Sequence, residues 1–234
     1  MIYAAIVAGG TGSRMGADIP KQFLPLGGKP VIIRTIERFL ECEEIDVVYI
    51  GVHPDWTEHL AEMCRENLTD TSKIRVIEGG SDRNGTVLRI VDSIRGERGI
   101  SDDDIIVTHD GVRPFVTIRE IAESITALDG YDGVTVCAPV KDTILCSEDG
   151  RGIDSVPDRD KLFRTLTPQT FRLSVLSDAF DKLPHETVSR LTDTAGLLRE
   201  LGKPVGLVRG GEFNIKLTTP IDMTLGELIL MQNS

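Results

Sequence analysis

Apolar, β-prone segments alternate with segments of helical periodicity along most of the chain, and this alternation restricts the folds that the chain can adopt. Several β-prone segments are apolar at consecutive positions, as strands are when both faces of their sheet are covered. The expected strands are residues 1–8, 47–52, 74–77, 105–108, 133–138 and 204–208. The expected helices are residues 31–40, 56–67, 86–94, 118–128, 174–182, 193–200 and 219–231. The pattern predicts an α/β fold, a Rossmann-like, mostly parallel sheet with helices on both faces, which binds ligands beyond the carboxyl ends of its strands.

One stretch, residues 141–170, breaks this alternation. It shows little helical periodicity and carries several turn-forming residues, among them Gly150, Pro157 and Pro168. A compact domain rarely contains so long an irregular connection without a separate purpose. We therefore expect this stretch to leave the sheet as a protruding β-arm of one domain that spans residues 1–234.

The overall composition is that of a globular protein, since 40% of the 234 residues are hydrophobic and 27% are charged. The formal net charge is -11 at pH 7. Such an excess of acidic residues repels a phosphate backbone, so a nucleic acid is not an expected partner. A small phosphorylated ligand would need basic residues concentrated at its own binding site.

The cysteines and the first residues bear on the cellular compartment. Cys42, Cys64, Cys137 and Cys146 form no Cys-x-x-Cys pair and no Cys/His metal spacing, which is typical of reduced thiols in the cytoplasm. Residues 1–8 are apolar, but the run is short, lacks a basic flank and leads directly into two glycines. It therefore predicts a core strand rather than a signal peptide or a membrane span, and we expect a cytoplasmic protein with no membrane partner.

A glycine-rich turn follows the first expected strand. Residues 8–16 read Ala-Gly-Gly-Thr-Gly-Ser-Arg-Met-Gly, and residues 20–22 read Pro-Lys-Gln. Glycines at the end of a strand allow backbone N–H groups to approach a phosphate chain closely. Arg14 and Lys21 supply the positive charge that the acidic chain as a whole lacks. The turn predicts a nucleotide-binding site formed by Ala8, Gly9, Gly10, Thr11 and Gly12.

Two other functions are compatible with such a turn. NAD(P)-dependent short-chain oxidoreductases have a similar dinucleotide-binding turn, but they need a catalytic Tyr-x-x-x-Lys, and none of Tyr3, Tyr49 and Tyr131 has a lysine four residues later. The turn also lacks the Gly-Lys-Ser/Thr ending of Walker phosphate loops. A nucleotide-binding subunit without activity is a further alternative, which fits poorly with the number of charged candidates named below.

Six further motifs follow the turn in a fixed order along nearly the whole chain. They are residues 79–84 (Gly-Gly-Ser-Asp-Arg-Asn), 109–114 (His-Asp-Gly-Val-Arg-Pro), 139–143 (Pro-Val-Lys-Asp-Thr), 167–171 (Thr-Pro-Gln-Thr-Phe), 191–193 (Leu-Thr-Asp) and 214–218 (Asn-Ile-Lys-Leu-Thr). With the turn, they resemble the sugar-phosphate and polyol-phosphate nucleotidyltransferases, in the order found in the 2-C-methyl-D-erythritol 4-phosphate cytidylyltransferase-like family. The resemblance implies a cytidylyltransferase that uses CTP and Mg²⁺, in which an acceptor phosphate oxygen attacks the α-phosphorus of CTP and pyrophosphate leaves. This chemistry needs positioning and charge stabilisation but no protein nucleophile.

The resemblance extends to the acceptor. Residues 52–56 (Val-His-Pro-Asp-Trp), 82–84, 113–115 (Arg-Pro-Phe) and 211–213 (Gly-Glu-Phe) are more similar to the ribitol-5-phosphate branch of the family. D-ribitol 5-phosphate is therefore the expected acceptor, and 2-C-methyl-D-erythritol 4-phosphate is the alternative. Gly111 departs from the family pattern, in which a small residue with a side chain is usual, and this departure leaves its implied role near the nucleotide ribose open.

The family pattern also implies roles for individual residues of this sequence. Arg14 and Lys21 are the implied catalytic pair, which stabilises charge on the α-phosphate and on the departing pyrophosphate. Asp110 is the implied Mg²⁺ ligand, because it follows an apolar strand and carboxylates suit this ion; its alternative is an ordinary Asp-Gly turn. The implied contacts of the nucleotide, beyond the glycine-rich turn, are Gly80, Ser81, Asp82, Arg83, Thr86 and Gly111.

The acceptor phosphate is expected near a basic pair, Arg159 and Lys216. Thr143, Thr167 and Thr192 are weaker candidates that could equally serve turns or caps. Arg159 lies on the irregular stretch, and in the family this arm crosses to a partner subunit. The resemblance therefore implies a homodimer in which each chain completes the site of the other.

Three residues near these motifs have structural alternatives. Thr86 or Asn84 can cap the helix expected over residues 86–94 while also facing the nucleotide. His109 is expected to be structural, because imidazole suits softer metals than Mg²⁺ and no second histidine lies nearby in the sequence.

Overall fold

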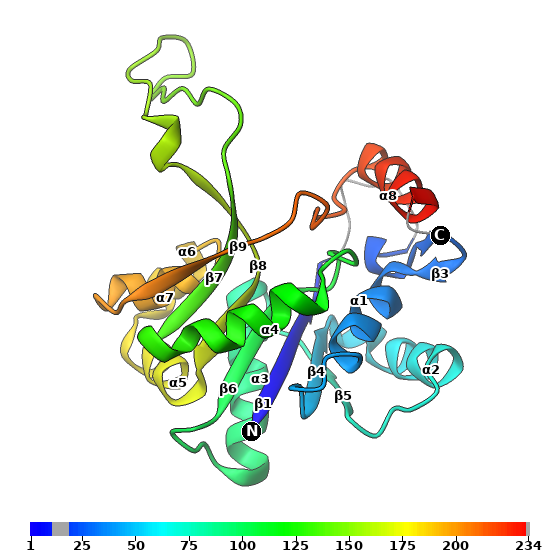
Figure 1. The fold of residues 1–234 in the computed structure, drawn as a ribbon. Coiled ribbons are helices and arrows are strands. Elements are labelled where there is room, and N and C mark those ends of the chain that lie inside the picture. The colour runs from blue at the N-terminus through cyan, green and yellow to red at the C-terminus, as the bar shows by residue number, and fades with distance from the viewer. Residues whose placement is uncertain (11–18, 233–234) are drawn as a thin grey trace.

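A seven-stranded sheet forms the centre of the fold (Figure 1). The computed structural model describes residues 1–10 and 19–232. From one edge of the sheet to the other, the strands are β5 (Ile74–Glu78), β4 (Val47–Val52), β1 (Ile2–Ala8), β6 (Ile105–Asp110), β8 (Phe163–Arg172), β7 (Gly133–Pro139) and β9 (Val205–Arg209). Only β8 is antiparallel to its neighbours among these strands, so the predicted Rossmann-like, mostly parallel sheet is confirmed. The short strands β2 (Pro25–Leu26) and β3 (Lys29–Pro30) pair separately.

Helices cover both faces of the sheet, as the sequence predicts (Figure 1). One face carries α1 (Val31–Leu40), α2 (Thr57–Asn67) and α4 (Ile118–Thr126). The other face carries α3 (Arg83–Arg98), α5 (Leu173–Lys182), α6 (His185–Arg190) and α7 (Ala195–Glu200). The last helix, α8 (Pro220–Gln232), packs against β2. Short 3-10 helices are η2 (Lys21–Phe23), η3 (Pro54–Trp56), η4 (Ala127–Gly130) and η5 (Arg159–Lys161).

The sheet separates two apolar cores, because successive side chains of a strand point to opposite faces. In β1, Ala4 and Ile6 belong to the core under α1 and α2, whereas Tyr3 and Ala5 belong to the core under α3 and α5. All four residues are buried. This burial on both faces explains the consecutive apolar residues from which the sequence predicts a covered sheet.

One strand departs from the prediction, although the other predicted elements end within four residues of their predicted positions. β8 begins inside the stretch assigned to the arm, residues 141–170, and lies within the sheet between β6 and β7. Its Pro168 argues against such a strand, because proline cannot donate a ladder hydrogen bond. The pairing of β7 with β8 shifts register between Thr135 and Cys137, and this irregularity accommodates Pro168. The arm is therefore shorter than predicted.

The segment between β7 and β8 forms the arm, which extends away from the body of the molecule (Figure 1). Its two sides meet in an isolated β-bridge between Cys146 and Ser155. Four apolar side chains of the arm are exposed to solvent: Ile144, Leu145, Ile153 and Val156.

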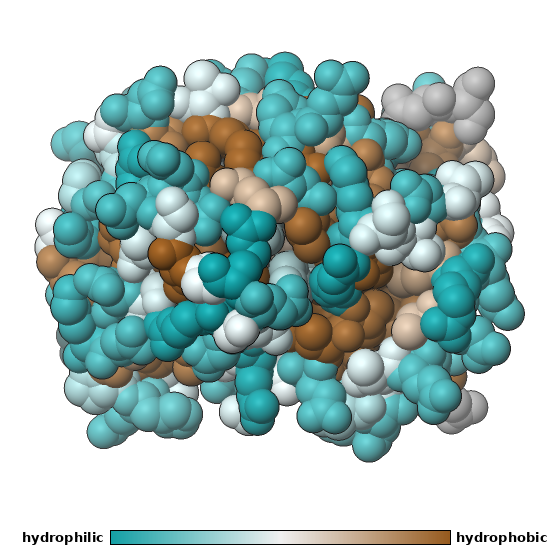
Figure 2. Space-filling model, turned by 90° about the horizontal axis from the view of Figure 1, so that it is seen from below, coloured by the Kyte–Doolittle hydropathy of each residue, from teal (hydrophilic) through white to brown (hydrophobic). Residues whose placement is uncertain are grey.

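Figure 2 shows the side of the molecule on which the parallel strands begin, which is the side opposite the arm. Hydrophilic side chains cover most of this surface, and hydrophobic atoms show in patches between them. No helix formed by residues 1–10 and 19–232 combines the length and the apolar character that crossing a membrane requires.

Candidate active site

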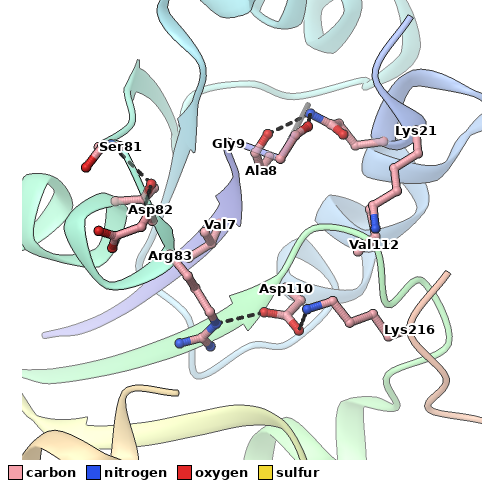
Figure 3. Close-up of a pocket in the computed structure, with 14 residues that line it drawn as sticks. Val7, Ala8, Gly9, Lys21, Ser81, Asp82, Arg83, Asp110, Val112 and Lys216 are labelled. Carbon is pink, nitrogen blue, oxygen red and sulfur yellow. Dashed lines mark hydrogen bonds and ion pairs between the residues drawn. The ribbon is translucent and has the colours of Figure 1, made fainter. Parts of the chain in front are cut away.

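A cavity of about 350 Å³ lies at the carboxyl ends of β1 and β6, beside the first turn of α3 (Figure 3). β4 and β5 lie on one side of β1, and β6 lies on the other, so the strand order reverses at this point. Open α/β sheets bind ligands at such switch points. The lining residues are Val7, Ala8, Gly9, Gly10, Lys21, Gln22, Gly80, Ser81, Asp82, Arg83, Thr86, Asp110, Val112 and Lys216.

Ala8, Gly9 and Gly10, the described part of the glycine-rich turn, form the wall after β1, and a buried glutamine holds them. The side-chain amide of Gln22 donates hydrogen bonds to the carbonyl oxygens of Ala8 (2.7 Å) and Gly10 (3.0 Å). Gln22 is the neighbour of Lys21 in η2, and the Lys21 side chain extends across the cavity toward the side that holds Asp110 (Figure 3). The other predicted residues of this turn, Thr11, Gly12 and Arg14, lie outside the described residues.

The turn before α3 forms a second wall. Asp82 is the N-cap of α3, and its carboxylate accepts a hydrogen bond from the Gly85 N–H (2.8 Å). The Thr86 hydroxyl donates to the Asp82 carbonyl (2.8 Å) and accepts from the Gly80 N–H (3.1 Å). The cap is thus Asp82 and not Thr86 or Asn84. Gly80 has no room for a side chain, because a Cβ there would lie 2.4 Å from the backbone of Gly85.

Asp110 holds three cations at the floor of the cavity, and Figure 3 shows two of them, Arg83 and Lys216. Its Oδ1 accepts from Arg83 Nε (3.0 Å), and its Oδ2 accepts from Arg113 Nε (3.1 Å) and lies 3.0 Å from Lys216 Nζ. Arg83 Nη1 also donates to the Thr194 hydroxyl (2.6 Å), so the Arg83 side chain runs along the floor. Burial alone would raise the pKa of the Asp110 carboxyl, but the three cations outweigh burial and hold this pKa well below its usual range. The floor therefore combines an ionised carboxylate with an excess of positive charge.

His109, beside Asp110, is a buried structural residue, as the sequence suggests. Burial lowers the pKa of its imidazole to about 3, so the ring is neutral. Its Nε2 lies 3.2 Å from the Arg113 carbonyl oxygen and therefore carries the proton. Its Nδ1 then accepts from the Thr167 hydroxyl (2.9 Å). Both ring nitrogens are used inside the protein.

Gly111 faces the core. Its N–H donates to the Val7 carbonyl (2.9 Å), and a Cβ at this position would lie 2.7 Å from Ile32 Cδ1 and 3.3 Å from the Ala8 Cβ. Ile32 on α1 and Ala8 at the end of β1 therefore leave little room for a side chain at position 111. Gly111 does not line the cavity, and its implied contact with the nucleotide stays a prediction.

The structure brings only part of the predicted acceptor site together. Lys216 lines the cavity, whereas Thr167 lies beside the end of β6 with its hydroxyl buried and hydrogen-bonded within the protein. Thr192 is exposed in the loop before α7. Thr143 and Arg159 are exposed on the arm and do not line the cavity. Within one described chain, the five predicted acceptor residues do not form a single site.

Three lining residues are not predicted from the sequence: Val7, Gln22 and Val112. Gln22 belongs to the Pro-Lys-Gln motif, and this membership was a usable signal. Val7 and Val112 are indistinguishable from core valines in the sequence, since only the end point of each strand brings them to the cavity. Arg113 has a structural role, because its guanidinium holds Asp110 and donates to the Asn214 carbonyl (3.0 Å).

Asp110 is the one carboxylate that the structure places at the cavity floor among its described residues, and three cations already share it. Among residues 1–10 and 19–232, no group of three or more His, Cys, Asp and Glu side chains is placed to hold a metal ion. Asp110 offers a single carboxylate, and the three cations use three of its roughly four lone-pair positions. Mg²⁺ commonly takes one or two carboxylates and completes its shell with water and substrate phosphates. Asp110 would therefore supply one ligand at most, and an Mg²⁺ that arrives with a nucleoside triphosphate would take the rest of its shell from water and phosphate oxygens.

Comparisons with known proteins identify a family and a shared fold. The family model described as IspD, 2-C-methyl-D-erythritol 4-phosphate cytidylyltransferase, matches residues 2–232. A 4-diphosphocytidyl-2C-methyl-D-erythritol synthase structure is 26% identical, with 98% of each chain covered and a TM-score of 0.81. The 2-C-methyl-D-erythritol 4-phosphate cytidylyltransferase of Francisella tularensis is 26% identical, with 97% of this chain and 98% of that chain covered and a TM-score of 0.80. The corresponding synthase of Anaerococcus prevotii has the same fold, with 24% identity, 98% and 96% coverage and a TM-score of 0.82.

Proposed function

The chain belongs to the 2-C-methyl-D-erythritol 4-phosphate cytidylyltransferase family. We propose that it transfers CMP from CTP to a polyol phosphate and, from its sequence motifs, that the acceptor is D-ribitol 5-phosphate. Membership makes the chain a CTP-dependent cytidylyltransferase. The products of the proposed reaction are CDP-ribitol and pyrophosphate.

The observation that carries this proposal is the concentration of cations at the switch point of an acidic protein. Lys21, Arg83 and Lys216 line one cavity, although the chain as a whole has a formal net charge of -11. Ala8, Gly9 and Gly10 of the glycine-rich turn and the first turn of α3 flank the same cavity. N–H groups of a glycine turn and of a helix N-terminus suit phosphate groups.

In the proposed reaction, an oxygen of the acceptor phosphate forms a bond with the α-phosphorus of CTP. The bond between this phosphorus and the oxygen that bridges to the β-phosphorus breaks, and that oxygen leaves with pyrophosphate. Lys21, with Arg14 by resemblance, would stabilise the charge that builds up on the α-phosphate and on the leaving group. The protein forms no covalent intermediate, so its contribution is orientation and charge.

The remaining roles follow the positions of the residues. We assign Ala8, Gly9 and Gly10, with Gly80, Ser81, Asp82 and Thr86, to the nucleotide, because both turns flank the cavity. Asp110 would hold Mg²⁺, which when bound neutralises charge on the phosphates of CTP. Lys216 would hold the acceptor phosphate, and Arg83 would fix the orientation of Asp110.

Two acceptors are candidates, and a different observation favours each. The motifs at residues 52–56, 82–84, 113–115 and 211–213 favour D-ribitol 5-phosphate. The names of the similar proteins favour 2-C-methyl-D-erythritol 4-phosphate. Both acceptors present a phosphate and a short polyol chain, so a change of acceptor would leave the proposed chemistry unaltered.

We also propose that two copies of the chain complete each other's sites through the arm. Arg159 and Thr143 lie on the arm, away from the cavity of their own chain, so a second copy is the simplest source of these groups at an acceptor site. The arm also exposes four apolar side chains, which a partner subunit would cover: Ile144, Leu145, Ile153 and Val156.

Pyrophosphate release from CTP and Mg²⁺, with each acceptor offered separately, tests the proposal. Release with D-ribitol 5-phosphate alone supports both the reaction and the acceptor, whereas release only with 2-C-methyl-D-erythritol 4-phosphate replaces the acceptor. No release with either would contradict the proposed function. A Lys216→Ala variant should lose this activity. The matched control is Lys182→Ala, which changes an exposed lysine on α5.

A further inference from the structure

Glu120 is a buried carboxylate whose two oxygens serve different parts of the molecule. It lies in the first turn of α4 and is 0% exposed. The ion pairs found among the described residues do not include Glu120, so its charge is compensated by hydrogen bonds alone. A buried charge is costly unless it is fully hydrogen-bonded, and the partners of Glu120 therefore indicate what it is there to hold.

The first oxygen, Oε2, completes the cap of α4. It accepts hydrogen bonds from the Thr117 N–H (2.8 Å) and the Thr117 hydroxyl (3.0 Å), while the Glu120 N–H donates to the same hydroxyl (3.1 Å). These contacts form a capping box. The box uses only one of the two carboxylate oxygens, so it does not account for the other.

The second oxygen, Oε1, holds the segment that leads to Lys216. It accepts from the Gly211 N–H (2.8 Å) and from Asn214 Nδ2 (3.3 Å). Asn214 Nδ2 also donates to the Thr167 carbonyl (2.8 Å). The orientation of the Asn214 amide is therefore fixed, because a flipped amide would turn its oxygen toward two acceptors.

Two further contacts connect this segment with the cavity floor. The Asn214 carbonyl accepts from Arg113 Nη1 (3.0 Å), and the Leu217 N–H donates to the Val112 carbonyl (2.9 Å). Lys216 lies between Asn214 and Leu217, with its Nζ 3.0 Å from Asp110 Oδ2. The backbone on both sides of Lys216 is thus anchored, and Glu120 is the anchor on the N-terminal side.

We infer that Glu120, acting through Gly211 and Asn214, is a positioning residue that sets the location of Lys216 for the acceptor phosphate. This inference rests on the proposed function. Glu120 touches no cavity-lining atom itself, so its effect should fall on the acceptor and not on CTP. If Glu120 served only the helix cap, replacing it would lower the stability of the protein and leave the KM values for both substrates unchanged.

The test measures steady-state constants for Glu120→Ala and Asn214→Ala. We expect the KM for the acceptor to rise about tenfold or more in each, as for the loss of a charge-assisted hydrogen bond, with the KM for CTP essentially unchanged. Glu120→Gln should recover part of the loss, since its amide oxygen can still accept from Gly211 and Asn214, while its amide nitrogen can no longer accept from the Thr117 N–H and so weakens only the cap. Two control variants should keep the acceptor KM: Thr117→Ala, which weakens the cap alone, and Glu123→Gln, at an exposed residue of the same helix.

An equal rise of both KM values, or an unchanged acceptor KM in folded variants, would overturn the inference. Amide hydrogen exchange at Leu217 gives a readout that does not depend on activity. Exchange there should quicken in Glu120→Ala and Asn214→Ala, and should not quicken in Glu123→Gln. If the wild-type protein transfers CMP to neither acceptor, the proposed function fails, and exchange at Leu217 still decides whether Glu120 positions the Lys216 segment.

Discussion

Replacing Asp110 by asparagine removes the negative charge that Arg83, Arg113 and Lys216 share at the cavity floor. The side chains of Arg83 and Arg113 are only 19% and 10% exposed, and the Asp110 side chain is 8% exposed. Removing one member of a buried ion pair costs about 3–5 kcal/mol, because the partner charges stay buried without compensation. Lys216 is 41% exposed, so water can replace its partner and its pair adds little. We therefore expect Asp110→Asn to lower the free energy of unfolding at pH 7 by about 3–5 kcal/mol.

Urea unfolding followed by far-UV circular dichroism and by the fluorescence of Trp56 measures this change. The matched control is Asp181→Asn, whose carboxylate pairs with Arg95 at the surface, where both side chains are at least 40% exposed. That change should cost at most about 1 kcal/mol. If Asp110→Asn costs no more than the control, the floor cations are solvated, and the account of Asp110 as their shared counter-charge is wrong.

The pH dependence of this difference provides a second check. The pKa of Asp110 is lowered in the folded state, so its contribution is fully present above the pKa of an unfolded aspartate, about 3.9. The contribution is lost as the pH falls below that value toward the folded-state pKa. The stability difference between the wild-type protein and Asp110→Asn should therefore be equal at pH 7 and pH 5 and should narrow only in stronger acid.

Three further predictions concern other parts of the site. Lys21→Ala should lower kcat for pyrophosphate release about 100-fold or more while Lys182→Ala does not, and a near-normal rate would remove Lys21 from the mechanism. Gly111→Ala should cost about 1–3 kcal/mol in urea unfolding, because the new Cβ would lie 2.7 Å from Ile32 Cδ1. Adding Ile32→Val should recover part of that loss, because it removes the atom that the new Cβ would contact. If the stability losses of the two single variants simply add in the double variant, the packing argument is wrong. Burial holds the folded-state pKa of His109 at about 3, so between about pH 6.5 and 3 His109 gains a proton only in the unfolded chain. The free energy of unfolding of the wild-type protein should therefore fall as the pH is lowered over that range, and it should fall less steeply in His109→Gln.

Most of the secondary structure could be predicted from local sequence patterns. The strand over residues 47–52 and the helix over residues 31–40 have the predicted ends, because hydrophobic periodicity is a local property that burial then confirms. β8 was not predicted, because its local sequence pattern is not that of a strand. Pro168 and a polar neighbourhood resemble a loop, and only the register shift against β7 allows this proline inside a sheet.

Part of the cavity could be predicted from the sequence, because the topology of the sheet determines which turns meet. The turn at residues 8–16, the turn at residues 79–84 and Asp110 each follow a predicted strand. The carboxyl ends of neighbouring parallel strands lie on the same side of a sheet, so Asp110, the turn before α3 and the first residues of the glycine-rich turn, Ala8, Gly9 and Gly10, meet there. The acceptor candidates Thr143 and Arg159 do not follow sheet strands in this way, and in one chain they remain on the arm.

By itself, the sequence determined the class of fold, the family and the strand ends at which the cavity lies, because periodicity and motif order are properties of the chain alone. The tertiary structure alone decided which side chains act on one another. Arg83 bonds Thr194 across 111 positions, and Asn214 bonds Glu120 across 94. Such pairs leave no local pattern, since their partners meet only after the sheet has brought distant turns together. The lack of space at position 111 is likewise invisible in the sequence, because the atom nearest to a Cβ there belongs to Ile32 on α1.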